Sequence, residues 1–435
     1  MDPGTERTAA VKTFMLGWEF PPYISGGLGT ACYGLTKAMD KLGIKVTFVL
    51  PRGTGNPVGS VKTIGTNDIR TATLSEQFIN TKFHVISSKL KPYASVGSHG
   101  HNYGSGKILL EIADTGPMLS PDNYTGDILT AVSQYAEKAM LIAGDEDFDV
   151  VHAHDWMTYP AGEAVSRQNH KPLVVHVHST EFDRSGEHVN QTVYDIERMG
   201  MHAASKVIAV SNLTKETIIK HYGIPHAKVE VVYNAVEHNG DGVCHIPAEK
   251  KDKIVLFLGR ITMQKGPEYF LAAAKKVLEV IDNVKFVMAG SGDMMHQIIE
   301  LAASMGIGNK VLFTGFLSGE DVNRAFKMAD LYVMPSVSEP FGISSLEAMD
   351  QNVPVLMSKQ SGISEVVTHA LKVDFWDIDE MANKMIAVLK RPQLKTTLGK
   401  NGFHESHKFN WEDSAAKVKN IYEEVIEQSK NKETQ

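Results

Sequence analysis

The sequence predicts an α/β protein with two doubly wound domains that face a central cleft. Three observations support this fold class: buried-strand patterns alternate with helix patterns, the alternation occurs twice, and a polar stretch separates the two runs. That stretch, HNGDGVCHIPAEKKDK at residues 238–253, is interpreted as a linker. The predicted domains are therefore residues 11–237 and 252–410, followed by an amphipathic helix at 412–429.

The first run begins with a strand at 12–17, a Gly- and Pro-rich loop, a helix at about 30–42 and a strand at 44–50. Strand, loop, helix and strand in this order form a βαβ unit, which predicts a parallel, Rossmann-like sheet. The segment 89–123 is a long irregular stretch, expected to contact an acceptor or act as a lid. Beyond it we expect helices at about 125–143, 159–168, 191–203 and 212–221, and strands at 149–153, 172–177, 206–210 and 228–233.

The second run repeats this alternation after the linker. Strands are expected at 254–259, 284–290, 310–315, 331–336 and 353–358, with helices from Pro267, at 294–305, at 319–328 and from about Ser345. In doubly wound folds, ligands bind at the carboxyl ends of the strands. If these edges of the two sheets face each other, a small ligand can be bound from both sides.

Composition excludes several classes of protein. The 435 residues carry 44 Lys and Arg against 51 Asp and Glu, a net charge of −7, which argues against a general nucleic-acid binder. No membrane-spanning segment is expected, because the chain lacks an apolar run of about 18 residues. Cys32 and Cys244 are too few for a disulfide framework, and the polar start MDPGTERTAA indicates no secretory signal, so a cytoplasmic location is expected.

Two loops at predicted strand ends could bind an anion. Residues 25–29, SGGLG, precede a helix, whose first N–H groups favour negative charge; an ordinary tight turn is the alternative. In the second domain Arg260 and Lys265 follow a strand, and Pro267 suits a first helical position. Arg and Lys both bind phosphate, although a solvated loop with ordinary surface charges would look the same.

Two carboxylates follow the strand at 331–336. Glu339 lies in the loop and Glu347 in the next helical turn, where a carboxylate can accept hydrogen bonds from sugar hydroxyls. Ser344 and Glu347 also have the spacing of a capping box, which is the alternative interpretation of Glu347.

Together, GRITMQKG, VVYNAVE, GSGD and SEPFGISSLEAM resemble the retaining glycosyltransferases of the GT-B fold. Within that group, HAHDW and the glycine loop are most similar to the glycogen and starch synthases. The resemblance covers nearly the whole chain, in order, and the E-x7-E pattern of Glu339 and Glu347 is its most specific part.

The resemblance implies a role for each of these side chains. Arg260 and Lys265 would hold the donor diphosphate and stabilise the leaving nucleotide, while Glu339 would contact the transferred sugar. Glu347 would bind the ribose hydroxyls. His154 would reach the sugar near the reaction centre.

The resemblance also implies supporting contacts. Asp155 would neighbour the catalytic histidine, Asn234 would lie near the cleft, and the final helix would pack back on the first domain, which is the acceptor side. Main-chain contacts to sugar or phosphate are implied for Gly27, Leu28, Phe341, Gly342 and Ile343.

The implied activity is retaining transfer of a hexosyl group, glucose first, from an ADP- or UDP-linked donor to a glycan acceptor such as an α-1,4-glucan, as in glycogen biosynthesis. No metal cofactor is expected. Ile24 departs from the synthases, which usually have Lys two positions before the first glycine of the loop. Because no carboxylate is placed as a covalent nucleophile, a same-face displacement is favoured, in which the departing phosphate helps to take the acceptor proton. Transfer of another sugar to a small, lipid or polysaccharide acceptor remains open.

Two alternatives belong to other classes. His152 and His154, and likewise His176 and His178, form HxH pairs at two strand ends, so four imidazoles could bind zinc in a hydrolase, with Asp155 and Asp183 completing the site. A non-catalytic nucleotide- or glycan-binding protein could also use this scaffold.

Overall fold

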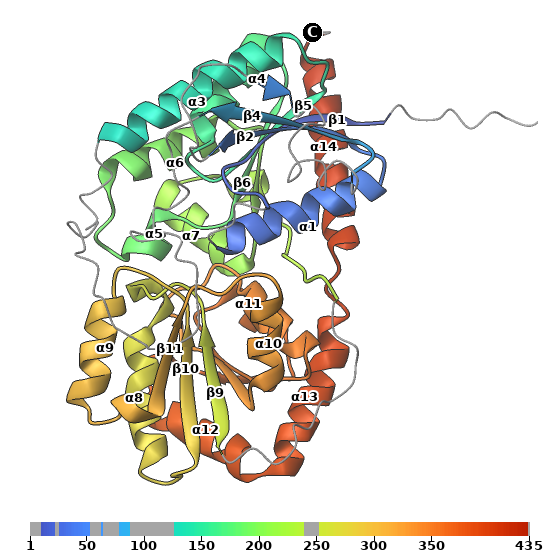
Figure 1. The fold of residues 1–435 in the computed structure, drawn as a ribbon. Coiled ribbons are helices and arrows are strands. Elements are labelled where there is room, and N and C mark those ends of the chain that lie inside the picture. The colour runs from blue at the N-terminus through green and yellow to red at the C-terminus, as the bar shows by residue number, and fades with distance from the viewer. Residues whose placement is uncertain are drawn as a thin grey trace, which may run out of the picture.

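The computed structural model describes residues 10–21, 26–52, 62–63, 78–87, 126–238 and 252–433. Ile24, Ser25, Cys244 and the segment 89–123 lie outside the described residues. The described strands form two sheets, each in its own lobe (Figure 1). We call these the first and second lobes, in chain order.

The sheet of the first lobe has eight strands in the order β3-β4-β2-β1-β5-β6-β7-β8. Every neighbouring pair is parallel except β3 and β4. Its strands are β1 Lys12–Leu16, β2 Lys45–Arg52, β3 Lys62–Thr63, β4 Thr81–Ser87, β5 Val150–His154, β6 Leu173–Val177, β7 Lys206–Ala209 and β8 Val229–Val231. Its helices are α1 Gly27–Lys41, α3 Gly126–Gly144, α4 Tyr159–Asn169, α5 Glu181–Ser185, α6 Gln191–Ala203 and α7 Asn212–Tyr222, with the 3₁₀ turn η2 His226–Lys228.

The sheet of the second lobe has six parallel strands in the order β11-β10-β9-β12-β13-β14. They are β9 Lys253–Leu258, β10 Val284–Ala289, β11 Val311–Gly315, β12 Leu331–Met334, β13 Val355–Ser358 and β14 Leu371–Val373. The helices and 3₁₀ turns are η3 Met263–Lys265, α8 Pro267–Leu278, α9 Met295–Ser304, η4 Gly308–Lys310, α10 Glu320–Met328, α11 Ile343–Asp350, η5 Gly362–Glu365, α12 Ile378–Lys390 and α13 Pro392–Ser406.

The predicted fold class is confirmed, because both sheets are doubly wound. Strands β5, β6 and β12 are buried at every position, so both faces of each strand are covered. Their near-continuous apolar runs suit this environment, because helices pack on both faces of a parallel sheet. The sequence patterns did not predict β4, β14, α5, α12 or α13.

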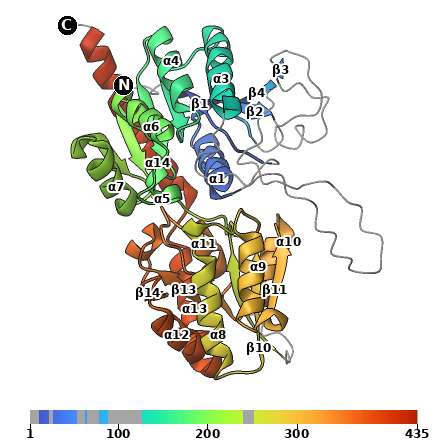
Figure 2. The same ribbon diagram turned by 90° about the vertical axis from the view of Figure 1, so that its left-hand side faces the viewer.

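The last helix, α14 Trp411–Glu433, returns to the first lobe. Figures 1 and 2 both place it there, although α13, which precedes it, lies in the second lobe. Helix α14 packs against α1 and reaches β5. The contact with α1 is close: a Cβ on Gly34 would lie 2.2 Å from Cε2 of Trp411, so only glycine fits there.

The lobes meet at the carboxyl ends of their strands. Helix α5 lies against η3, and α7 lies against η5. A pocket between the lobes is lined by Thr30 and Tyr33 from the first and by Ile343, Glu347 and Asp350 from the second. The two sheets therefore share one interface, where the residues at their strand ends come together.

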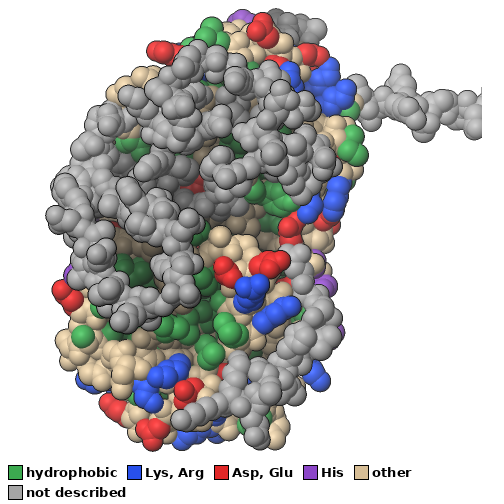
Figure 3. Space-filling view, viewed as in Figure 1, with side chains coloured by type: hydrophobic (Ala, Val, Ile, Leu, Met, Phe, Trp, Pro, Cys, Tyr) green, Lys and Arg blue, Asp and Glu red, His purple; other side chains and the backbone are tan. Residues whose placement is uncertain are grey.

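The visible face of the molecule carries mixed charges. On its uncovered part, basic and acidic side chains lie next to each other and beside hydrophobic ones, without a continuous basic surface (Figure 3). Among the described residues, no helix has the length and apolar character needed to cross a membrane.

Candidate active site

The loop after β9 carries two of the predicted cations. Gly259 follows the strand, Arg260 comes next, and Lys265 ends the 3₁₀ turn η3. Gly266 has a φ of +64° and leads into α8, where Pro267 occupies the predicted first position. The loop after β10 packs closely against the loop after β9, since a Cβ on Gly292 would lie 2.2 Å from the carbonyl oxygen of Ile261. The glycines of GSGD thus allow two strand-end loops to touch.

Lys265 and Glu339 meet across neighbouring strand ends. Lys265 Nζ donates to Glu339 Oε2 at 2.5 Å, and Ser336 Oγ donates to the same oxygen at 3.1 Å. Arg260 Nη2 donates to Gln264 Oε1 at 3.2 Å. The structure therefore brings Arg260, Lys265 and Glu339 to the carboxyl ends of β9 and β12, as the sequence suggested.

The segment after Glu339 turns sharply into α11. Phe341 is buried, and Gly342, with a φ of +110°, is the N-cap residue before Ile343. No side chain caps this helix; Ser344 Oγ instead accepts a hydrogen bond from Tyr332 Oη at 2.8 Å. The capping-box interpretation of Ser344 and Glu347 is therefore wrong, because Gly342 takes the cap position.

Glu347 lines the pocket between the lobes. Loss of solvation, together with the nearby charge of Asp350, raises the pKa of Glu347 to about 7. A carboxyl group with this pKa changes its charge near neutral pH, and only its ionised form is a pure hydrogen-bond acceptor.

The first lobe presents the N-terminus of α1 on its side of the interface. Gly27 and Leu28 are its first two residues, and the N-cap residue Gly26 has no side chain to bond their N–H groups. The first N–H groups of a helix lack intrahelical partners and favour an anion. Asn234, also predicted near the cleft, is buried at 7% exposure, three residues after the end of β8.

His154 ends β5 and is fully buried. Its Nδ1 lies 2.9 Å from His178 Nε2, whereas its Nε2 has no hydrogen-bond partner among the described residues. Burial, reinforced by the neighbouring histidines, holds the pKa of His154 well below its ordinary value, so the imidazole is neutral. The imidazole can reach a ligand only if the side chains around it move.

Asp155 supports this strand end from a left-handed conformation, with φ of 58°. Its Oδ1 accepts the main-chain N–H of His178 at 2.7 Å. Burial raises the pKa of Asp155 to about 7. Asp155 therefore fixes the chain that carries His178, which in turn contacts His154.

The four histidines of the HxH pairs do lie together. Two groups have potential ligand atoms within 4.8 Å of one another: His152, His154 and His176, and Cys32, His154 and His178. However, the rings of His152 and His176 stack at 6°, and those of His152 and His154 at 30°. The rings of His152 and His176 are nearly parallel, so the lone pairs of these two rings lie in parallel planes and do not point at a common atom between them.

The two carboxylates proposed to complete a zinc site have other partners. Asp155 accepts the N–H of His178, and Asp183 binds Thr180 and Ser338. Among the described residues, the potential metal ligands around His154 are therefore imidazoles and the thiol of Cys32. Asp155 and Asp183, which the zinc hypothesis added to the site, are not among them.

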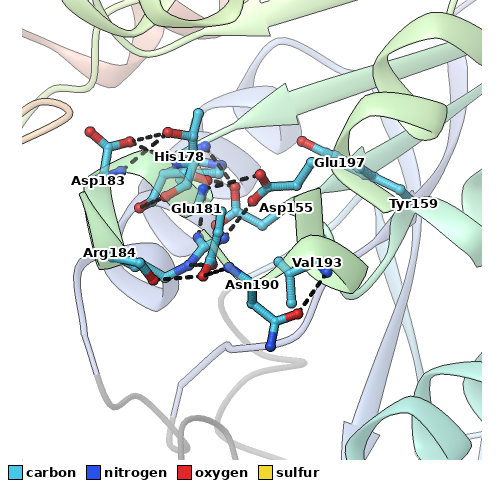
Figure 4. A network of polar contacts seen from close by, with 12 residues as sticks. Asp155, Tyr159, His178, Glu181, Asp183, Arg184, Asn190, Val193 and Glu197 are labelled. Atoms are coloured by element: carbon cyan, nitrogen blue, oxygen red, sulfur yellow. Dashed lines mark hydrogen bonds and ion pairs between the residues drawn. The ribbon is translucent and has the colours of Figure 1, made fainter. Parts of the chain in front are cut away.

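A buried polar network surrounds α5 (Figure 4). Arg184 Nε donates to Glu181 Oε2 at 3.0 Å, and the same guanidinium contacts Glu197. Asp183 forms a capping box with Thr180. The sequence patterns did not indicate this network, although the T-x-x-D spacing of Thr180 and Asp183 is the signal of a helix start.

Two doubly wound sheets joined at their strand ends, with cations and a carboxylate at that junction, have the architecture of the GT-B glycosyltransferases. Family models agree: residues 245–430 match the glycosyl transferases group 1, and residues 123–239 match Glycosyltransferase Family 4. The protein is thus a hexosyltransferase of the GT-B fold, and its residues 245–430 match the glycosyl transferases group 1.

Known proteins resemble the chain over most of its length. An uncharacterized glycosyltransferase of Methanocaldococcus jannaschii is 29% identical over 96% of this chain and 99% of its own. The glycogen synthase of Mycobacterium tuberculosis is 23% identical over 82% of this chain and 80% of its own.

Solved structures share the fold. Sucrose-phosphate synthase of Thermosynechococcus elongatus has a TM-score of 0.74 at 19% identity and covers 96% of this chain and 100% of its own. The HepE protein of Anabaena, solved with UDP-glucose, has a TM-score of 0.66 at 19% identity, with 95% of this chain and 99% of its own covered.

Proposed function

We propose that this protein transfers a hexosyl group, glucose as the first candidate, from a nucleotide sugar to a glycan acceptor with retention of the anomeric configuration. An α-1,4-glucan is the proposed acceptor, which would place the protein in glycogen-type biosynthesis in the cytoplasm. The proposal needs no metal ion.

One observation carries this proposal: Lys265 and Glu339 are in contact at the junction of the lobes, beside Arg260. A cation pair can neutralise a diphosphate, and the carboxylate can accept hydroxyl hydrogen bonds from the sugar joined to it. In this structure Lys265 and Glu339 satisfy each other's charge. Binding of a donor would replace this ion pair with contacts to phosphate and sugar.

Both lobes would supply the remaining donor contacts. The N–H groups of Gly27 and Leu28, at the start of α1, suit the diphosphate, and Glu347 suits the ribose. Main-chain groups of Phe341, Gly342 and Ile343 would contact sugar and phosphate. His154 would turn toward the sugar its Nε2, which has no hydrogen-bond partner among the described residues, once the side chains around it move.

The proposed reaction is a same-face displacement. The bond between the anomeric carbon and the phosphate oxygen breaks, Arg260 and Lys265 stabilise the charge on the leaving nucleotide, and the acceptor oxygen bonds to the same face. The acceptor proton passes to the departing phosphate oxygen. No covalent glycosyl-enzyme forms, so a sugar trapped on any side chain would contradict this mechanism.

Two comparisons make glucose the first sugar to test. One relative is a glycogen synthase, and one structural neighbour was solved with UDP-glucose. One experiment identifies both the donor sugar and its nucleotide: nucleotide release is measured from UDP- and ADP-linked glucose, galactose and mannose, with and without glycogen. We expect glycogen to stimulate release from a glucose donor and EDTA to leave the rate unchanged.

Proton NMR of the product tests retention, since an α-linked donor should give an α-linked product. His154→Ala, measured beside the exposed His296→Ala as control, tests catalysis against mere binding. Equal transfer by wild type and His154→Ala would remove His154 from the catalytic residues. Absence of glucan stimulation with any donor would overturn the synthase proposal.

A further inference from the structure

Glu339 lies in a loop of the second lobe, and the first lobe forms hydrogen bonds with the residue before it and the residue after it. Ser338 Oγ donates to Asp183 Oδ1 at 2.6 Å. The carbonyl oxygen of Pro340 accepts a hydrogen bond from Ser211 Oγ, also at 2.6 Å. Asp183 and Ser211 belong to the first lobe, so Glu339 lies between two hydrogen bonds that join the lobes.

Both partners in the first lobe are themselves fixed at helix N-termini. Asp183 Oδ2 accepts from the main-chain N–H and the hydroxyl of Thr180, at 2.7 and 2.8 Å, in the capping box of α5. Ser211 is the N-cap of α7 and accepts from Thr214 N at 3.0 Å. Side chains held in this way lose little further freedom when they bind the loop.

The junction is also closely packed. A Cβ on Gly362 would lie 2.2 Å from the Pro340 carbonyl oxygen and 2.5 Å from Ser211 Cβ. Gly362 N donates to the carbonyl oxygen of Glu339 at 2.9 Å, so the same glycine holds the loop from the second lobe. Within the second lobe, Glu339 N also donates to the carbonyl oxygen of Gln360 at 3.0 Å. The two contacts at Ser338 and Pro340 are added to these, and they exist only while the lobes touch.

We propose that Asp183 and Ser211 are positioning residues for Glu339, so that contact between the lobes sets the carboxylate in its sugar-binding orientation. The proposal rests on the proposed function, in which Glu339 contacts the transferred sugar. Its consequence is that approach of the lobes both encloses the donor and completes the sugar site. Transfer would then be coupled to closure through Ser338 and Pro340.

A contact between the lobes that avoids this loop provides a comparison. Glu365 of the second lobe accepts the main-chain N–H groups of Asn212 and Leu213 at 3.0 and 2.6 Å. It joins the lobes without bonding to Ser338 or Pro340. If the lobes merely need to adhere, Glu365→Ala and Ser338→Ala should have the same effect.

The test compares Ser338→Ala with Ser338→Thr, which keeps the hydroxyl, and with Ser304→Ala. Ser304 Oγ bonds only within its own helix end, so this control removes a hydroxyl from the same lobe. We expect Ser338→Ala to lower kcat roughly three- to tenfold, the worth of one hydrogen bond. The dissociation constant of UDP, measured by calorimetry, should not change, because Arg260 and Lys265 are untouched.

Ser338→Thr should restore kcat, and the control Ser304→Ala should match wild type. Ser211→Ala should lower kcat as Ser338→Ala does, and Ser211→Thr should restore it. A Glu365→Ala variant should raise the KM for donor more than it lowers kcat. Wild-type kcat in Ser338→Ala, or equal losses of kcat and UDP affinity, would overturn the positioning role while leaving the proposed function intact. A wild-type protein that transfers no sugar would overturn both.

Discussion

At the scale of single residues, Glu347 links donor binding to pH. Burial and the charge of Asp350 raise the pKa of Glu347 to about 7, so the group is mostly protonated at pH 6 and mostly ionised at pH 8. The ribose hydroxyls need an acceptor, which the carboxylate form provides best. We therefore expect the KM for donor to fall about tenfold as pH rises from about 6 to about 8.

Initial rates across this range, for wild type and Glu347→Gln, check the expectation. The glutamine variant cannot ionise, so its KM should be higher and nearly independent of pH. Asp155, whose pKa burial also raises to about 7, remains in both proteins and serves as the internal control for other titrations. A KM that varies equally with pH in both proteins would assign the dependence to another group.

At this scale, the sequence predicted the placement of residues that lie at the ends of strands. Arg260, Lys265 and Glu339 come together because parallel strands present their carboxyl ends at one edge, which the apolar runs made predictable. The contacts of Asp183 and Ser211 could not be predicted, because they depend on how the two lobes dock. Docking brings together residues more than one hundred positions apart in the chain, and no local pattern records it.

At the scale of elements, length decided what the sequence could predict. Helix α6 was predicted at its observed bounds because its apolar positions recur over several turns. Helix α5 has five residues, EFDRS, and β14 has three, so neither is long enough to show a period. Polar partners, rather than an apolar face, stabilise α5, since Arg184, Glu181 and Glu197 bond to one another within the protein.

Helix α14, near the end of the chain, packs on β5, the strand that carries His152 and His154. Tyr422 on α14 has its hydroxyl 2.5 Å from Nδ1 of His152, and both groups are buried. Tyr422→Phe would leave this ring nitrogen buried without its partner, which costs about 1–3 kcal/mol. Urea denaturation should therefore show a correspondingly lower free energy of unfolding.

Tyr194→Phe is the matched control for this change. Its hydroxyl donates to the carbonyl oxygen of His221 at 2.9 Å in a less buried setting, where water can replace it, so the loss should be smaller. Equal stabilities of Tyr422→Phe and wild type would show that the contact with His152 contributes nothing to folding.

At the scale of the whole molecule, two sets of buried groups make stability depend on pH in opposite directions. The pKa values of Asp155, Glu197 and Glu347 are raised, chiefly by burial, so their contribution to stability decreases as pH rises toward neutrality. The buried histidines act in the opposite sense. Their lowered pKa values mean that the unfolded chain binds protons below about pH 6.5 while the folded protein does not, so stability falls as pH falls.

Because these contributions oppose each other, the overall pH profile cannot isolate the histidines, but a single replacement can. His176 is buried, has no hydrogen-bond partner for either ring nitrogen among the described residues, and its pKa lies well below the ordinary value because of burial. The substitution His176→Leu removes this imidazole and leaves the buried carboxyl groups in place. The measured quantity is the free energy of unfolding of the variant minus that of wild type. We expect this difference to be about 2 kcal/mol more positive at pH 5 than at pH 7.5, because only wild type must keep His176 unprotonated in the folded protein. Urea denaturation of both proteins at the two pH values measures this difference, with the exposed His296→Leu as control. A stability difference that is the same at both pH values would mean that His176 takes up a proton in the folded protein.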